Sequence, residues 1–316
     1  MDGEIMREIA KKYLKEFDEL EKKACNEEKK FIDGYGKKIE NIFSEKCQSM
    51  FKEIENIDSI SILPEYEDKL RKLELIYFLL DEKGFDYAKH MMENVTEGNK
   101  WKTEAKIRLL MMFVKRFYEV LYLLKGGLAS SALDRARGMY EIAVYLEIII
   151  NNNESVSEKF LKHCNTSRLE LAKCLGNQQI IEEITDQIND FNDDDFYKKN
   201  NGWAKELFPH NTRGISFKNL ADITKFKQYY FNYKIACLST HATIIDSVQG
   251  IELDKGSKGK NIWNTGASKN GFEFVFSMLF SCSCEILIDS LESKSLSNAF
   301  ILVCIKEIGS SNKKGN

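Results

Sequence analysis

Three side chains of this sequence have the types that proton transfer and charge stabilisation require, namely Arg137, Glu141 and His241. A histidine exchanges a proton near neutral pH, an arginine stabilises negative charge that develops in a transition state, and a glutamate orients either of them. Cleavage of a phosphodiester can proceed by such chemistry without a metal ion or any other cofactor. We therefore take these three residues as the candidate catalytic set.

The spacing around the arginine places four polar residues on one stripe of a predicted helix. Ser130, Asp134, Arg137 and Glu141 follow one another at steps of four, three and four, inside a segment, 129–150, that is otherwise apolar nearly all round. Such a helix is expected to be buried centrally, so the stripe either forms a self-satisfied ion pair or faces a functional cleft. Removal of Glu141 should cost about 3–5 kcal/mol if the pair is buried, and far less in a wet cleft.

A second polar stripe is predicted on a helix at 226–249. It comprises Tyr230, Lys234, Cys237 and His241, with Ser239 nearby. A lone histidine is more often a core residue than a catalyst, and a Cys237–His241 dyad would need an orienting group and an oxyanion site that the sequence does not identify. If the two stripes face each other, the arginine and the glutamate should lie within contact reach of the histidine.

These two segments resemble a bacterial family of helical proteins, domain of unknown function 5677. The family pattern S-A-L-x-L-x-R-S-L-x-E appears here as SSALDRARGMYEIAVYL, which places its arginine on Arg137 and its glutamate on Glu141. The pattern Y-x-x-Y-x-x-x-S-x-x-x-H appears as YYFNYKIACLSTHAT, which places its histidine on His241. Two departures are Gly138 in place of a small polar residue and Cys237 in place of serine. The resemblance spans about residues 100–250 and implies a helical fold and one shared site, without a defined activity.

A looser likeness is to the HEPN ribonucleases of bacterial toxin and phage-defence systems, whose motif is R-x-x-x-x-H. Ala236 stands five residues before His241, so the arginine would have to come from the other helix, as Arg137. This likeness implies a metal-independent ribonuclease acting on RNA. The alternative is a non-enzymatic helical interaction or ligand-sensing module, and the absence of P-loop, Rossmann, zinc and kinase motifs fits both hypotheses.

The elements that would position these residues are predicted to be helices, because only Pro64 and Pro209 interrupt the chain. The pattern predicts an all-α multi-helix bundle with a polar loop at 192–215 and another at 252–271. The helices are expected at 66–96, 102–124, 129–150, 155–175, 178–190, 216–223, 226–249, 270–292 and 295–308.

Three regions are predicted along the chain: an amphipathic arm at 1–60, a helical core domain at 66–310 and a disordered tail at 311–316. The arm carries apolar residues from Ile9 to Ile57 at helical spacing, typical of an amphipathic helix or a coiled coil. Its stripe needs a partner surface, either in the body or in another copy of the chain, and we predict a homodimer or a protein partner.

Composition bounds the remaining possibilities. The formal net charge of −3 does not favour binding to nucleic acid or to an anionic membrane. It leaves room for a local basic patch. The apolar run 272–288 contains Glu273 and Glu285 and is predicted to be a core helix, with no membrane contact. Eight scattered cysteines and a charged N-terminal sequence favour reduced thiols and a cytoplasmic location.

Overall fold

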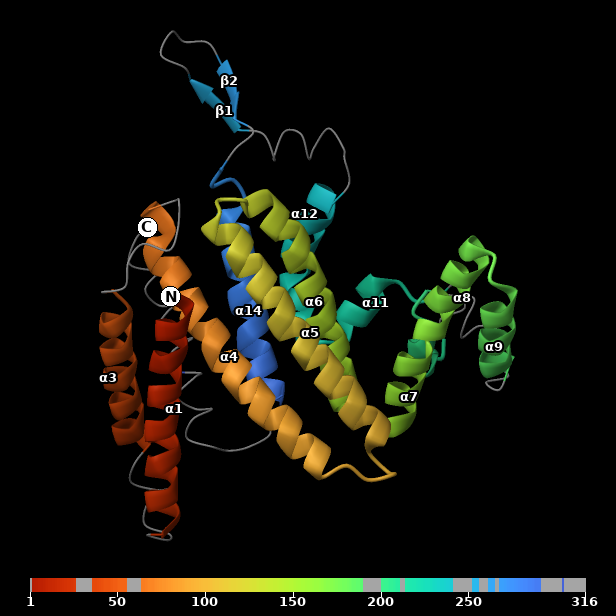
Figure 1. Cartoon of the computed structure of the whole chain (residues 1–316), viewed down its shortest axis with the longest axis horizontal. Coiled ribbons are helices and arrows are strands. Elements are labelled where there is room, and N and C mark those ends of the chain that lie inside the picture. The colour runs from red at the N-terminus through yellow and green to blue at the C-terminus, as the bar shows by residue number, and fades with distance from the viewer. Residues whose placement is uncertain are drawn as a thin grey trace. The chain divides into compact units, whose positions relative to one another are not determined.

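The structure is a computed structural model that describes residues 2–26, 36–55, 64–189, 200–210, 214–240, 252–255, 261–264, 267–290 and 303 (Figure 1). Its first elements are α1 (Asp2–Asn26), α3 (Gly36–Glu55), η1 (Pro64–Tyr66), α4 (Glu67–Glu93), α5 (Lys100–Lys125) and α6 (Ala129–Asn151). They are followed by α7 (Glu154–Lys162), α8 (Cys164–Leu175), α9 (Gln178–Asn189), η2 (Gly202–Leu207), α11 (Phe217–Asp222), η3 (Lys225–Tyr229) and α12 (Tyr230–Thr240). The final elements are β1 (Glu252–Lys255), β2 (Asn261–Asn264) and α14 (Phe272–Ser290).

The predicted all-α class is confirmed. The described strands form one antiparallel pair, β1 with β2, in which Leu253 lies opposite Trp263. This hairpin corrects the prediction of a polar loop at 252–271, where the β-forming residues Ile262 and Trp263 outweigh the many polar neighbours. The helix predicted at 295–308 and the tail at 311–316 fall outside the described elements.

The chain forms two compact units that do not follow its linear order. Unit 1 contains Met1–Ala88, Leu110–Ala143 and Phe231–Asn316, and unit 2 contains Lys89–Leu109 and Val144–Tyr230. Helices α4, α5 and α6 each contribute residues to both units. The predicted division into an arm and one core domain stays a prediction.

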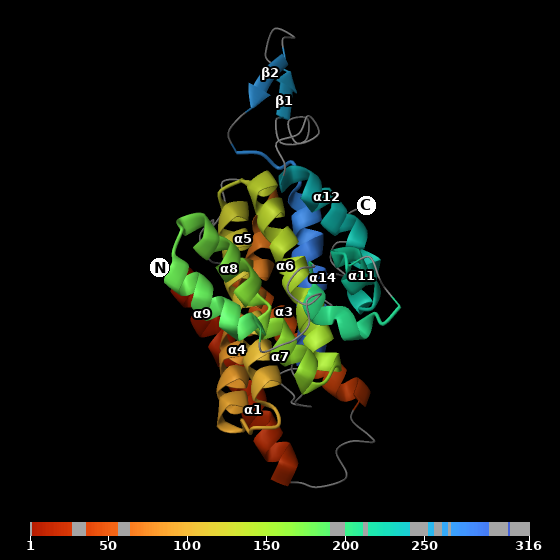
Figure 2. The ribbon, with the colours of Figure 1, turned by 90° about the vertical axis from the view of Figure 1, so that its right-hand side faces the viewer.

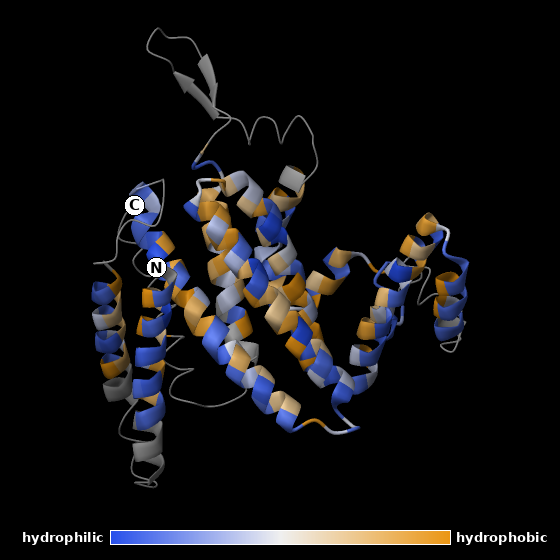
Figure 3. Ribbon diagram, in the orientation of Figure 1, coloured by the Kyte–Doolittle hydropathy of each residue, from blue (hydrophilic) through white to orange (hydrophobic). Residues whose placement is uncertain are grey.

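In unit 1 the amphipathic helices α1 and α3 bury their apolar faces. Phe17 of α1 is fully buried and packs edge-on against Phe43 of α3, with ring centres 4.9 Å apart. Figure 3 shows α1 as mostly hydrophilic outside this face. The apolar stripe thus has a packing surface within its own unit, and the predicted dimer and coiled coil stay predictions.

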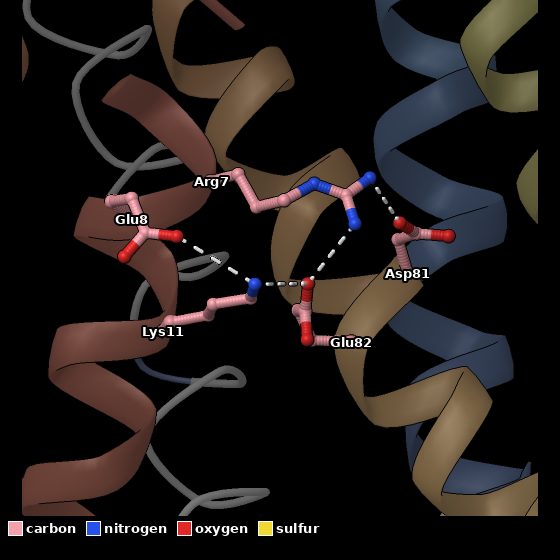
Figure 4. Close-up of polar contacts among 5 residues, drawn as sticks. All are labelled: Arg7, Glu8, Lys11, Asp81 and Glu82. Carbon is pink, nitrogen blue, oxygen red and sulfur yellow. Dashed lines mark hydrogen bonds and ion pairs between the residues drawn. The ribbon is translucent and has the colours of Figure 1, made fainter. Parts of the chain in front are cut away.

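Charged side chains join α1 to α4, as Figure 4 shows. Arg7 Nη2 lies 2.8 Å from Asp81 Oδ2, and Arg7 Nη1 lies 3.3 Å from Glu82 Oε1. Lys11 approaches the same Glu82 oxygen at 3.8 Å. These side chains are partly exposed, so each ion pair contributes little by itself and the apolar face supplies most of the stabilisation.

The start of α6 is fixed by its turn from α5 and by α14. Gly127 has φ 67°, a left-handed conformation that glycine adopts without strain, and its carbonyl accepts a 2.8 Å hydrogen bond from Ser268 N–H. Phe272, at the beginning of α14, is fully buried and stacks on Tyr66 with ring centres 3.7 Å apart. In both views α14 and α12 run alongside α6 (Figures 1 and 2).

The apolar run 272–288 is a core helix, as predicted, because Val275 and Leu279 of α14 are fully buried. Among the described helices, none is long and apolar enough to cross a membrane.

Unit 2 is organised around the end of α6. Both carboxylate oxygens of Glu147 accept hydrogen bonds from Lys225 N–H at 3.1 Å, at the beginning of η3. Tyr145 packs edge-on against Trp203 and Phe217, with ring centres 5.9 and 5.8 Å apart. The helix predicted at 155–175 is divided at His163, whose backbone ends α7 and precedes α8.

Candidate functional site

Arg137 and Glu141 lie one turn apart on α6, as the spacing predicted. The Nε atom of Arg137 is 3.8 Å from Glu141 Oε1, which is an ion pair too long for a hydrogen bond. Their side chains are 29% and 28% exposed, so the pair is neither sealed in the core nor fully solvated. Of the two interpretations of the stripe, this geometry fits a partly open site better than a buried ion network.

The buried apolar residues of α6 fix which side of the helix carries Arg137 and Glu141. Leu133, Ala136, Met139, Tyr140 and Ala143 are all buried, which leaves one side of the helix for polar residues. Ser130 and Asp134 lie on that side and are partly exposed. The negative charge of Asp134 also acts on Arg137 and contributes to raising the pKa of the guanidinium.

Tyr233 of α12 connects this helix to α6. Its hydroxyl donates a 3.1 Å hydrogen bond to Glu141 Oε1, and its ring stacks on Tyr140 with centres 5.1 Å apart. Burial raises the pKa of the Tyr233 hydroxyl, and a hydrogen bond with the Cys237 thiol and the charge of Glu141 raise it further. The hydroxyl therefore stays protonated and serves as a donor to the carboxylate.

Cys237 lies one turn beyond Tyr233 on α12 and close enough to Arg137 to raise the pKa of its guanidinium. Burial alone would lower the pKa of Arg137, but Glu141 raises it, with smaller contributions from Cys237 and Tyr233, so that its pKa lies above the ordinary value. Cys237, the later residue of α12, thus neighbours Arg137, the earlier residue of α6, whereas Tyr233 contacts Glu141. The two helices therefore run antiparallel at the site.

Arg137 is incompletely satisfied in this arrangement. Its Nε atom is buried, and no hydrogen-bond acceptor for it exists among the described residues. An N–H group that is withdrawn from water without an acceptor is unfavourable. An anionic ligand that brought an oxygen to this guanidinium would remove the penalty.

Gly138 follows Arg137 on α6 and precedes Glu141 by three residues. Apart from its chain neighbours and the backbone of α6, no described atom lies within 4 Å of a Cβ built on this glycine. A glycine inside a helix costs about 0.5–1 kcal/mol relative to alanine. This is also one of the two positions where the chain departs from the family pattern.

His241 follows directly on α12 in the sequence but lies outside the described residues, so its predicted contact with Arg137 and Glu141 stays a prediction. Ser239 belongs to α12, and only its backbone is described. Lys234 is exposed. Tyr230 falls in unit 2, where Lys218 Nζ lies 4.9 Å from its ring centre.

Of the predicted stripe on this helix, the structure places Cys237 near Arg137 and Tyr230 in unit 2. A single α-helix was expected from 226, but Lys225–Tyr229 forms a 3₁₀ helix and α12 begins only at Tyr230. Tyr233 was missed as a site residue, although it stands four residues before Cys237 and is the second tyrosine of the YxxY pattern.

A separate pocket of about 690 Å³ lies within unit 2. His163, Asn201, Ile215 and Phe217 line it, together with Asn200, Gly214 and Ser216. No cluster of histidine, cysteine and acidic residues with metal-binding geometry occurs in the described part of the chain.

The fold is therefore all-α, and α6 carries a partly exposed Arg137–Glu141 ion pair. In a comparison with family models, residues 103–257 match the model described as "Family of unknown function (DUF5677)". The match includes both motifs and confirms the resemblance seen there. Comparisons with curated proteins and with solved structures gave no match.

Proposed function

We propose that this protein is a metal-independent ribonuclease whose site is formed by Arg137, Glu141 and His241. The observation that supports this proposal most is the environment of Arg137, a partly exposed guanidinium on an otherwise apolar helix, with a buried Nε that lacks an acceptor among the described side chains. Such a group is suited to hold a phosphate and to stabilise the extra negative charge of the transition state.

The proposed reaction is attack of a ribose 2′ oxygen on the adjacent phosphorus. The bond from phosphorus to the 5′ oxygen breaks as the new bond forms. A base takes the 2′ proton and an acid protonates the departing 5′ oxygen, and His241 fills one of these roles. Arg137 neutralises the non-bridging oxygens, while Glu141, held by Tyr233, keeps the guanidinium in position.

The test is cleavage of a labelled single-stranded RNA by the purified full chain in the presence of EDTA. Wild type should cleave, whereas Arg137→Ala and His241→Ala should each lose activity by about 100-fold or more while keeping normal helical circular dichroism. Arg135→Ala is the matched control, because Arg135 is exposed on the same helix and should leave cleavage unchanged. A wild type without activity, or a His241→Ala variant with full activity, would contradict the proposal.

A ligand-sensing module is the second candidate, and the pocket in unit 2 favours it. Its volume of about 690 Å³ falls in the range of small-molecule sites, and Phe217 offers an aromatic wall. On this proposal AMP, which combines a flat base with a phosphate, should raise the melting temperature of wild type. Ile215→Trp, which fills the pocket, should abolish the rise, whereas an unchanged shift would exclude this pocket as the origin.

A further inference from the structure

Gly138 is a helix-interior glycine that the described fold does not require. It is absent from the glycines with positive φ, so no special backbone conformation explains it. Apart from its two chain neighbours, no described side chain would meet its Cβ within 4 Å, so close packing against other elements does not explain it either. Gly84 of α4 is a useful contrast, because there a Cβ would lie 3.3 Å from Met111 Cε.

Gly138 and Glu141 are three residues apart on α6 and so are neighbours on the helix surface, and one carboxylate oxygen of Glu141 remains available. Tyr233 and Arg137 both approach Oε1 of Glu141, at 3.1 and 3.8 Å. Within the described residues, Oε2 has no hydrogen-bond partner, and the side chain is 28% exposed. An ionised carboxylate oxygen accepts hydrogen bonds and donates none, so a ligand at this position must offer a hydroxyl or an N–H group.

Combining these features, we infer that Gly138 and Glu141 form a seat for the ribose of an RNA chain, with Glu141 Oε2 accepting a hydrogen bond from the 2′ hydroxyl. The absence of a side chain at Gly138 lets the sugar approach α6, and Arg137 holds the neighbouring phosphate. This inference rests on the proposed ribonuclease function and names how the same site selects its substrate. Deoxyribose lacks the 2′ hydroxyl, so the site should prefer RNA to DNA.

The inference predicts an opposite effect of one substitution on stability and on binding. Alanine favours helix over glycine, so Gly138→Ala should melt at the same or a higher temperature than wild type. The added methyl group, and still more the side chain of Gly138→Leu, should block the approach of the sugar. A purely structural role of Gly138 would instead lower the melting temperature of both variants.

The experiment measures binding of fluorescein-labelled single-stranded RNA and DNA of one sequence by anisotropy. Every protein carries His241→Ala, so that cleavage does not disturb the measurement. We expect at least tenfold tighter binding of RNA than of DNA, and loss of this preference in Gly138→Leu and in Glu141→Gln. Ser131→Leu adds the same bulk at an exposed position of α6 and should keep the preference.

The outcomes separate this inference from the proposed function. Equal binding of RNA and DNA, or an undiminished preference in Gly138→Leu, would overturn the ribose seat and leave the ribonuclease proposal standing. Absence of RNA binding in the His241→Ala protein, together with absence of RNA cleavage by wild type, would overturn the proposed function itself.

Discussion

The hydroxyl of Tyr233 donates a hydrogen bond to Glu141 Oε1 at 3.1 Å, across 92 positions of the sequence. This contact joins α12 to the polar stripe of α6, and the stacking of Tyr233 on Tyr140 fixes its direction. Glu141 consequently has one oxygen held and one oxygen available. The position of the carboxylate next to Arg137 therefore depends on a residue of another helix.

Tyr233→Phe should lower the free energy of unfolding by about 1 kcal/mol, because Glu141 loses its donor while the ring keeps its stacking on Tyr140. Urea denaturation measures the change. Tyr122→Phe is the matched control, since the side chain of Tyr122 is 68% exposed and its hydroxyl can bond to water. Equal effects of the two substitutions would show that the Tyr233 hydrogen bond contributes nothing to stability.

Glu141→Gln should lower the free energy of unfolding by no more than about 1 kcal/mol, because a partly exposed ion pair is screened by water. A double-mutant cycle with Arg137→Gln isolates the coupling between the two side chains. If Glu141→Gln costs about 3–5 kcal/mol instead, the pair behaves as a sealed buried pair and the open-site interpretation is wrong.

Phe17→Ala should lower the free energy of unfolding by about 3–5 kcal/mol, because it removes a fully buried ring from the α1–α3 contact. Ile5→Ala on the same helix removes a side chain that is 46% exposed and should change little. Chemical denaturation of both variants measures the difference. Similar small losses would mean that the packing of α1 adds little to the stability of unit 1.

Glu53 should make the packing of α1 on α3 sensitive to acid. The hydrogen bond from Lys12 lowers the pKa of Glu53, opposed by burial and aided by the Tyr13 hydroxyl. Because the folded pKa lies below the unfolded value, the stabilisation is present above the unfolded pKa and is lost as the pH falls through the folded one. The side chain is 38% exposed, so the contribution is at most about 1 kcal/mol.

The measurement is the free energy of unfolding of wild type and Glu53→Gln between about pH 6 and about pH 3. The two proteins should differ most at the upper end and converge at the lower end. A difference that does not change with pH would show that the ionisation of Glu53 is not involved.

Most of the helical fold followed from the sequence because apolar periodicity and sparse prolines act locally. Pro64 and the Gly126–Gly127 pair mark boundaries that the structure reproduces within a few residues. The grouping into two units did not follow, because it depends on contacts between distant segments. The β1–β2 hairpin was missed because the many polar residues around Trp263 resemble those of a loop.

The α6 half of the site followed from the sequence, since Arg137 and Glu141 lie within one regular helix. The contact of Tyr233 with Glu141 did not follow, because it depends on how two helices far apart in the sequence pack against each other. The glycine at position 138, where the family has a small polar residue, was visible in the sequence. The space around it could be seen only in the structure.

The hydrogen bond between Ser268 N–H and Gly127 O also bears on how the protein is made. It joins the turn before α6 to a segment far downstream in the sequence, and both belong to unit 1. The buried faces of α4, α5 and α6 can therefore be covered by α12 and α14 only after these later helices have been synthesised. We expect unit 1 to fold cooperatively once α12 and α14 have been synthesised, because its contacts join segments that are distant in the sequence.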